Sequence, residues 1–175
     1  MFKKLLFVVF FFPTLSSADI VVDLTTPEAA SFSEKYPEYE WMRLLSFADT
    51  GENLAITAFQ ISKDVDEFDL YIATISSSKK GKQKLYITIP DTCSEGDPKL
   101  DENTTIKTNE QNVMYLRFCD GKRVYLTPFS DAGNDFLINE FKTKKSVSFV
   151  FYDLIVIIDA AGFTEAWNSF GGDAL

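Results

Sequence analysis

The sequence predicts a mainly β protein, an antiparallel sandwich or a partly closed barrel that ends in a short helix. Three features predict this fold class. Short apolar runs with period-2 alternation recur along residues 41–158, in a number that indicates seven or more strands. Clusters of Gly, Pro, Asn, Asp and Ser separate these runs, as in turns. The last apolar segment instead repeats its large residues at helical spacing.

The N-terminus is typical of a cleavable secretory signal peptide at residues 1–18. Lys3 and Lys4 precede an apolar run at residues 5–12, and Ser16-Ser17-Ala18 supplies the small residues of a cleavage site. This apolar run is far shorter than the roughly 20 residues that span a bilayer. We therefore expect an exported bacterial protein with one domain at residues 19–175, without stable membrane insertion after cleavage. The periplasm is the expected location, with the outer surface or the exterior as alternatives.

The charge is strongly acidic. The chain has 17 basic and 26 acidic residues, a net charge of −9, and removing Lys3 and Lys4 with the signal peptide leaves −11. This balance disfavours nucleic acid and anionic lipid as partners and favours a basic protein or envelope component. The lysines nevertheless gather in two clusters, which we interpret as solvated loop or strand ends, with a docking patch for an acidic partner as the alternative. The clusters are Lys79, Lys80, Lys82 and Lys84, and Lys142, Lys144 and Lys145.

Two cysteines, Cys93 and Cys119, lie in the expected exported part. An even pair in an oxidising compartment predicts a disulfide. Closing a loop of this length stabilises a fold by roughly 3–4 kcal/mol in the chain-entropy model. The spacing is not the C-x-x-C of a redox site, so we expect a structural disulfide.

Along the chain, a short strand is predicted at residues 19–24 and a short helix at residues 28–35. Period-2 patterns then predict a series of strands. Their expected ranges are 41–47, 54–61, 68–75, 84–89, 113–119, 122–126, 146–152 and 154–158. A turn is expected at residues 49–53, and a polar loop at residues 91–103. Residues 136–141 fit a strand or a helix equally well.

Three local features refine the strands. Pro90 is expected to end its strand, because proline cannot donate a hydrogen bond to the ladder. Asp120 and Gly121 predict a tight hairpin with a type I′ turn. Residues 154–158 are continuously apolar, which predicts a strand buried on both faces.

The C-terminal segment predicts a helix with one apolar face against the sheet. Phe163, Ala166, Trp167 and Phe170 fall at i, i+3, i+4 and i+7, and the two glycines that follow end the helix. Five aromatic residues at core periodicity are assigned to the core. These are Phe149, Phe151, Phe163, Trp167 and Phe170. Tyr36, Tyr39 and Trp41 are candidates for the exposed aromatics of a partner surface.

No catalytic, cofactor-binding or metal-ligating residue is predicted. The absence of histidine excludes Ser-His-Asp and Cys-His catalysis and the usual histidine-bearing metal sites. The acidic run that begins at Asp64 lacks the glycine and distal glutamate of an EF-hand, so we interpret it as a solvated turn. It comprises Asp64, Asp66, Glu67 and Asp69. A hydrolase that uses carboxylates stays open as a third possibility.

The C-terminal half resembles the invasion-associated locus B family of small exported proteins from Gram-negative bacteria. The likeness comprises the tandem apolar strands at residues 146–158, the Gly-Phe-Thr-Glu-Ala-Trp segment at residues 162–167, and the cysteine-bearing strand at residues 113–119. A tryptophan-led strand at Trp41 fits the same layout. The cysteine positions differ from those usual in the family. The resemblance implies a periplasmic or surface-associated β protein linked to host invasion or envelope function, with structural roles for Gly162, Phe163 and Ala166.

These observations favour a non-enzymatic exported β-domain that binds an envelope or host partner. The alternative is a periplasmic inhibitor of a basic enzyme such as a lysozyme, because the acidic charge suits a basic target. In that case the loop at residues 91–103, which begins beside Cys93, would enter the active site of the enzyme.

Overall fold

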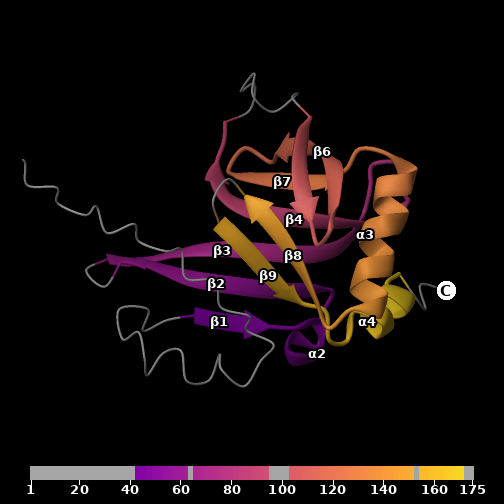
Figure 1. The fold of residues 1–175 in the computed structure, drawn as a ribbon, viewed down its shortest axis with the longest axis horizontal. Helices are drawn as coiled ribbons and strands as arrows, with labels where there is room; N and C mark the ends of the chain where they lie inside the picture. The colour runs from indigo at the N-terminus through magenta and orange to yellow at the C-terminus, as the bar shows by residue number, and fades with distance from the viewer. Residues whose placement is uncertain (1–41, 63–64, 95–102, 152–153, 172–175) are drawn as a thin grey trace, which may run out of the picture.

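The computed structural model describes residues 42–62, 65–94, 103–151 and 154–171 (Figure 1). The expected signal peptide, the strand at residues 19–24 and the helix at residues 28–35 lie outside the described residues. So do Tyr36, Tyr39 and Trp41, the three candidates for exposed aromatics.

The described residues form one antiparallel sheet of nine strands, which confirms the predicted fold class. The strands are β1 (Met42–Leu45), β2 (Leu54–Ser62), β3 (Val65–Ser77), β4 (Gln83–Thr92), β5 (Thr104–Thr108), β6 (Gln111–Cys119), β7 (Arg123–Pro128), β8 (Ser146–Phe151) and β9 (Leu154–Asp159). Their order in the sheet is β1-β2-β3-β4-β7-β6-β5-β8-β9. The strands therefore form two meanders, β1–β4 and β5–β7, which join where β4 pairs with β7, and a β8–β9 hairpin that joins where β8 pairs with β5.

The two ends of the sheet approach each other, so the sheet is a nearly closed barrel. The hydroxyl of Thr57 in β2 donates a 2.7 Å hydrogen bond to the carbonyl oxygen of Ile157 in β9. Thr57 is fully buried at this seam. A side chain thus satisfies a backbone acceptor that ladder pairing would satisfy in a fully closed barrel.

Aromatic rings fill one end of the barrel. Phe47, Phe141 and Phe163 pack together, with centroid distances of 5.0–6.1 Å. Phe149 continues this cluster toward the middle of the barrel, 6.4 Å from Phe141. The predicted core assignment is confirmed for Phe149 and Phe163, which are fully buried, and the other predicted aromatics pack against this core while partly exposed.

Among the described residues, three helices complete the fold: α2 (Phe47–Thr50), α3 (Asp131–Thr143) and α4 (Phe163–Ser169). The hydroxyl of Ser130 caps α3 by accepting from the amide of Gly133, and α3 buries Leu137 and Phe141 against the barrel. The expected C-terminal helix is α4, which lies beside α3 in Figure 1. None of the helices in the described residues is long and apolar enough to span a membrane.

Several local predictions are wrong. The strand predicted at residues 41–47 ends at Leu45, and an unpredicted helix, α2, precedes the bends at residues 51–53, because Ser46 and Asp49 form a reciprocal capping box. Pro90 lies within β4, where the register with β7 shifts between Ile89 and Thr92, and a bulge of this kind accommodates a residue without an N–H. The segment expected as a solvated turn around the acidic run belongs from Val65 onward to β3.

In the second half of the chain one further prediction fails, and one strand has no predicted counterpart. The strand expected to be buried on both faces is β9, at one end of the sheet order, and its Leu154 and Ile155 are 42% and 38% exposed. The short strand β5 lies where no element is predicted, because its Thr-Thr-Ile-Lys-Thr sequence offers a single apolar residue. The undecided segment at residues 136–141 is helical, within α3.

Candidate binding surface

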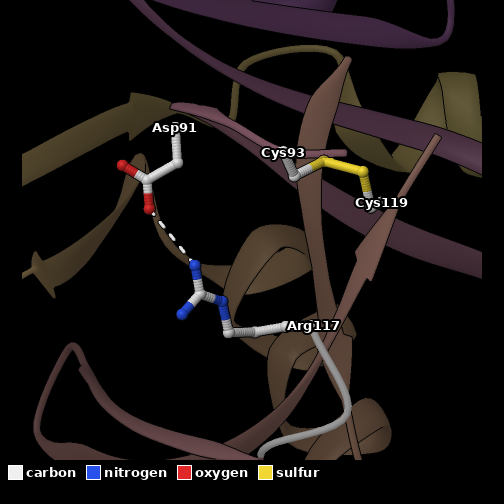
Figure 2. Close-up of polar contacts among 4 residues, drawn as sticks. All are labelled: Asp91, Cys93, Arg117 and Cys119. Atoms are coloured by element: carbon white, nitrogen blue, oxygen red, sulfur yellow. Dashed lines mark hydrogen bonds and ion pairs between the residues drawn. A yellow bond between two sulfur atoms is a disulfide. The ribbon is translucent and has the colours of Figure 1, made fainter. Parts of the chain in front are cut away.

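The predicted disulfide between Cys93 and Cys119 is confirmed. It joins the chain just after β4 to the last residue of β6, across the start of β7, with the two Cα atoms 6.0 Å apart. Figure 2 shows the bond at this end of the strands. Because β7 lies between β4 and β6 in the sheet, the disulfide closes a three-strand unit, β4-β7-β6, at one end.

The turn between β6 and β7 is held by the carboxylate of Asp120. One oxygen accepts from the amides of Lys122 and Arg123 at 2.9 and 2.8 Å, and the other accepts from the Tyr125 hydroxyl at 2.7 Å. These hydrogen bonds lower the pKa of Asp120 to about 2, the backbone bond from Arg123 contributing most. The same contact with Asp120 raises the pKa of Tyr125.

The hairpin was predicted correctly, but its turn type was not. A type I′ turn needs two successive residues with positive φ. Here Gly121 has a φ of 90° and Asp120 is not in the positive-φ region. The Asp120 carboxylate instead accepts hydrogen bonds from the turn amides, which explains why an aspartate precedes the glycine.

Three of the exposed large apolar side chains gather on the outer face of the three-strand unit. Met114 and Phe118 of β6 are 48% and 43% exposed, and Phe129, directly after β7, is 54% exposed. Phe118 pairs with Tyr125 across the strands, and the Phe129 amide donates to the Met114 carbonyl. Side chains of directly paired residues share one face of a sheet, so these four residues form one surface.

The surface extends across the middle of the same strands. Leu116 pairs with Thr127, and the pairing of Ile87 with Leu126 places Tyr86 of β4 opposite Thr127 on the other side. Leu116 and Tyr86 are half-buried. We call the whole surface the outer aromatic face. It comprises Tyr86, Met114, Leu116, Phe118, Tyr125 and Phe129.

The outward side of an antiparallel sheet is expected to be polar where it meets water. The outer aromatic face departs from this rule over three neighbouring strands, and no other element of the described chain covers Met114, Phe118 or Phe129. Contiguous exposed apolar surfaces of this kind mark sites of interaction, because covering them removes apolar area from water. The chemistry available here is therefore contact with another apolar surface.

The inner face at the disulfide end carries a charged pair. Arg117 pairs with Leu126, which places it on the side opposite to Phe118, and its Nη2 lies 3.3 Å from Oδ2 of Asp91. Figure 2 shows the two side chains facing each other beside the disulfide. The Nε of Arg117 is buried and has no hydrogen-bond partner in the described structure.

Tyr71 lies on the inner side of β3 and stacks on Phe151 of β8, with 5.5 Å between ring centroids. Burial, followed by the negative charges of Asp69 and Asp91, raises the pKa of Tyr71 to about 12. Its phenol therefore stays protonated at neutral pH. This arrangement supplies neither an activated nucleophile nor a base near neutral pH, and within the described ranges no three potential metal ligands lie together.

A polar recess of about 470 Å³ lies beside α3. Asn109, at a φ of 48°, donates to the Glu140 carboxylate at 2.6 Å and accepts from the amide and hydroxyl of Ser148. Asparagine tolerates this left-handed conformation better than most residues. The side chain of Asn109 thus ties the β5–β6 turn to α3 and β8, and its polar groups are used within the fold.

The sequence identified the disulfide but missed the outer aromatic face. The signal was present in the Val-Met-Tyr-Leu-Arg-Phe run of residues 113–118, where both alternating sets contain large apolar residues. One set, Val113 and Tyr115, is buried. The other set includes Met114 and Phe118, and no element of the predicted fold covers these two side chains.

No protein family, no curated protein and no solved structure matches this chain.

Proposed function

We propose that this protein is an exported, non-enzymatic β-domain that binds a protein or envelope component through its outer aromatic face. The observation that carries the proposal is the exposure of Met114, Phe118 and Phe129 on strands that a disulfide holds together. A binding surface of this kind gains affinity when its aromatic residues are held in position before the partner arrives. The disulfide and the Asp120 turn supply this rigidity.

The disulfide also supports export, because such bonds persist in oxidising compartments. The periplasm is the proposed location, in agreement with the signal-peptide pattern of residues 1–18. The resemblance to the invasion-associated locus B family belongs to the same proposal, and its implied envelope or host partner agrees with a contact surface rather than a catalytic cleft.

The test is an affinity capture from envelope extract with the purified protein and two double variants. Phe118→Ser with Phe129→Ser should reduce retention of the captured partner at least about tenfold, as expected for two central aromatic contacts. Leu154→Ser with Ile155→Ser, at exposed apolar positions of β9, is the matched control and should retain the partner. Equal retention by both double variants would exclude the outer aromatic face as the contact surface.

The strongly acidic charge favours one alternative, an inhibitor of a basic enzyme such as a lysozyme. A mixing assay separates the two functions. Inhibition that weakens with salt and persists in the Phe118→Ser, Phe129→Ser variant would support the inhibitor. Failure to inhibit any lysozyme, together with the loss of partner capture in this variant, supports the proposed binding function.

A further inference from the structure

The two lysine clusters, about 60 residues apart in the sequence, meet at one end of the barrel around α4. The Nζ of Lys142, in the last turn of α3, lies 5.7 Å from the centroid of the Trp167 ring. Gln83, which lies between Lys82 and Lys84 of the first cluster, donates a 2.7 Å hydrogen bond to the carbonyl oxygen of Trp167. Both clusters therefore flank the same residue of α4.

The lysines at this end are free to meet a partner. All are exposed except Lys84, which is half-buried, and no ion pair within the described ranges includes any of them. We call them the lysine end: Lys79, Lys80, Lys82, Lys84, Lys142, Lys144 and Lys145. Trp167 lies between them and packs on Phe163, 5.5 Å away.

The lysine end concentrates positive charge in a chain that is acidic as a whole. It holds seven of the 17 basic residues, against 26 acidic residues in the chain. Acidic residues also lie at this end: Glu165 of α4 is exposed, Asp159 pairs with Ser146 beside Lys145 and accepts from the amide of Ala161, and Glu140 of α3 is hydrogen-bonded to Asn109. The acidic net charge of the sequence thus does not reveal that one end of the barrel is rich in lysine.

We propose that the lysine end docks peripherally on a membrane surface that contains anionic lipid. The cluster consists of lysines without arginine, and lysine is a flexible point charge suited to a diffuse layer of negative headgroups rather than to bidentate recognition of single carboxylates. The half-buried indole of Trp167 is a side chain typical of the membrane interface.

This docking leaves the Phe118 end of the proposed partner surface available. Phe118 lies near the disulfide, at the opposite end of β4 and β6 from the β3–β4 turn. The two surfaces adjoin at Lys84, which is two residues from Tyr86 on the same side of β4. Lys79, Lys80, Lys144 and Lys145 lie outside the outer aromatic face, so lipid binding and partner capture can fail separately.

The experiment is co-sedimentation of the purified protein with vesicles of equal phosphatidylglycerol and phosphatidylcholine, compared with vesicles of phosphatidylcholine alone. We expect binding to the anionic vesicles only, and its loss between about 0.05 and 0.5 M salt as the charges become screened. Each lysine near such a surface contributes roughly a fivefold increase in partition coefficient. The double variants Lys79→Gln, Lys80→Gln and Lys144→Gln, Lys145→Gln should each therefore bind about 25-fold more weakly.

The matched control is Lys122→Gln with Arg123→Gln, which removes two exposed charges beside the disulfide. It should reduce binding by less than about threefold, and any contribution of the N-terminal residues is common to all variants. Absence of binding to the anionic vesicles overturns the proposal. So does binding to polyglutamate in place of vesicles, or an equal effect of the control variant and the two lysine variants.

Discussion

At the scale of single residues, one carboxylate organises the turn that presents the outer aromatic face. Asp120 accepts from two turn amides and from the hydroxyl of Tyr125. The hydrogen bonds favour its charged form, so its pKa is lowered from 3.8 to about 2. Its contribution to stability is therefore complete above the unfolded pKa and is lost as the pH falls through the folded value.

The first prediction concerns this titration. The amide proton shifts of Lys122 and Arg123, followed by NMR from pH 5 to pH 1.5, should change with a midpoint near pH 2. Asp120→Ala should abolish this transition and make the turn amides exchange faster, whereas Asp120→Asn keeps an acceptor oxygen and should slow exchange relative to alanine. A midpoint near pH 4 would contradict the hydrogen-bonded carboxylate.

A second residue-scale prediction concerns Gly162, where α4 meets α2. Its φ is +79°, and a Cβ added there would lie 2.6 Å from the backbone nitrogen of Ala48. Gly162→Ala therefore combines an unfavourable φ with a backbone clash, and should lower the free energy of unfolding by about 3 kcal/mol.

The matched control for this prediction is Gly81→Ala. Gly81 also has a positive φ, of +74°, but a Cβ there meets nothing within 4 Å. The cost should be about 1 kcal/mol, from backbone conformation alone. Urea unfolding of both variants measures the difference, and equal costs would show that the approach of α2 and α4 is not tight.

At the scale of elements, period-2 alternation located most strands because one side of each had to enter the core. Alternation failed to predict the structure where backbone pairing, rather than side-chain burial, decided it. Pro90 stays in β4 because a bulge relieves it of ladder pairing, and β5 forms although its side chains are mostly polar, because β6 pairs along its whole length. Long-range pairing of this kind leaves no local signal.

The candidate surface was predictable only in part, for a related reason. The disulfide follows from two cysteines and an expected oxidising compartment. The outer aromatic face depends on the order of the strands, since Phe118 of β6 meets Tyr125 of β7, and Tyr86 of β4 lies across β7 from Leu116. The predicted hairpin places β6 beside β7. The pairing of β4 with β7 requires a crossover, which the alternation of apolar and polar residues does not predict.

The third prediction tests the disulfide as an element-scale constraint. It closes a loop of 26 residues, and Cys93→Ser with Cys119→Ser should lower the free energy of unfolding by about 3.5 kcal/mol in the chain-entropy model. Denaturant unfolding checks this value. Because the bond joins β4 to β6 across β7, partner capture should also weaken on reduction. Capture that is unchanged on reduction would show that the face is held by the sheet alone.

At the scale of the whole molecule, a buried core and two surfaces of different character share one barrel. The aromatic core closes the end beneath α3 and α4, the lysine end lies around α4, and the outer aromatic face covers β4, β7 and β6. A domain arranged in this way can rest on an anionic surface by one end while its side meets a partner. The proposed binding function therefore depends on the geometry of the sheet rather than on a reactive group.

The most direct test of this central claim is photo-crosslinking in the intact producing cell, with a benzophenone amino acid replacing Phe118, Phe129 or Leu154 in turn. We expect that Phe118 and Phe129 give the same discrete crosslinked partner, and that Leu154, which is exposed on β9, gives none. Crosslinks of the same partner from Leu154 alone, or from all three positions equally, would contradict the outer aromatic face as the binding surface.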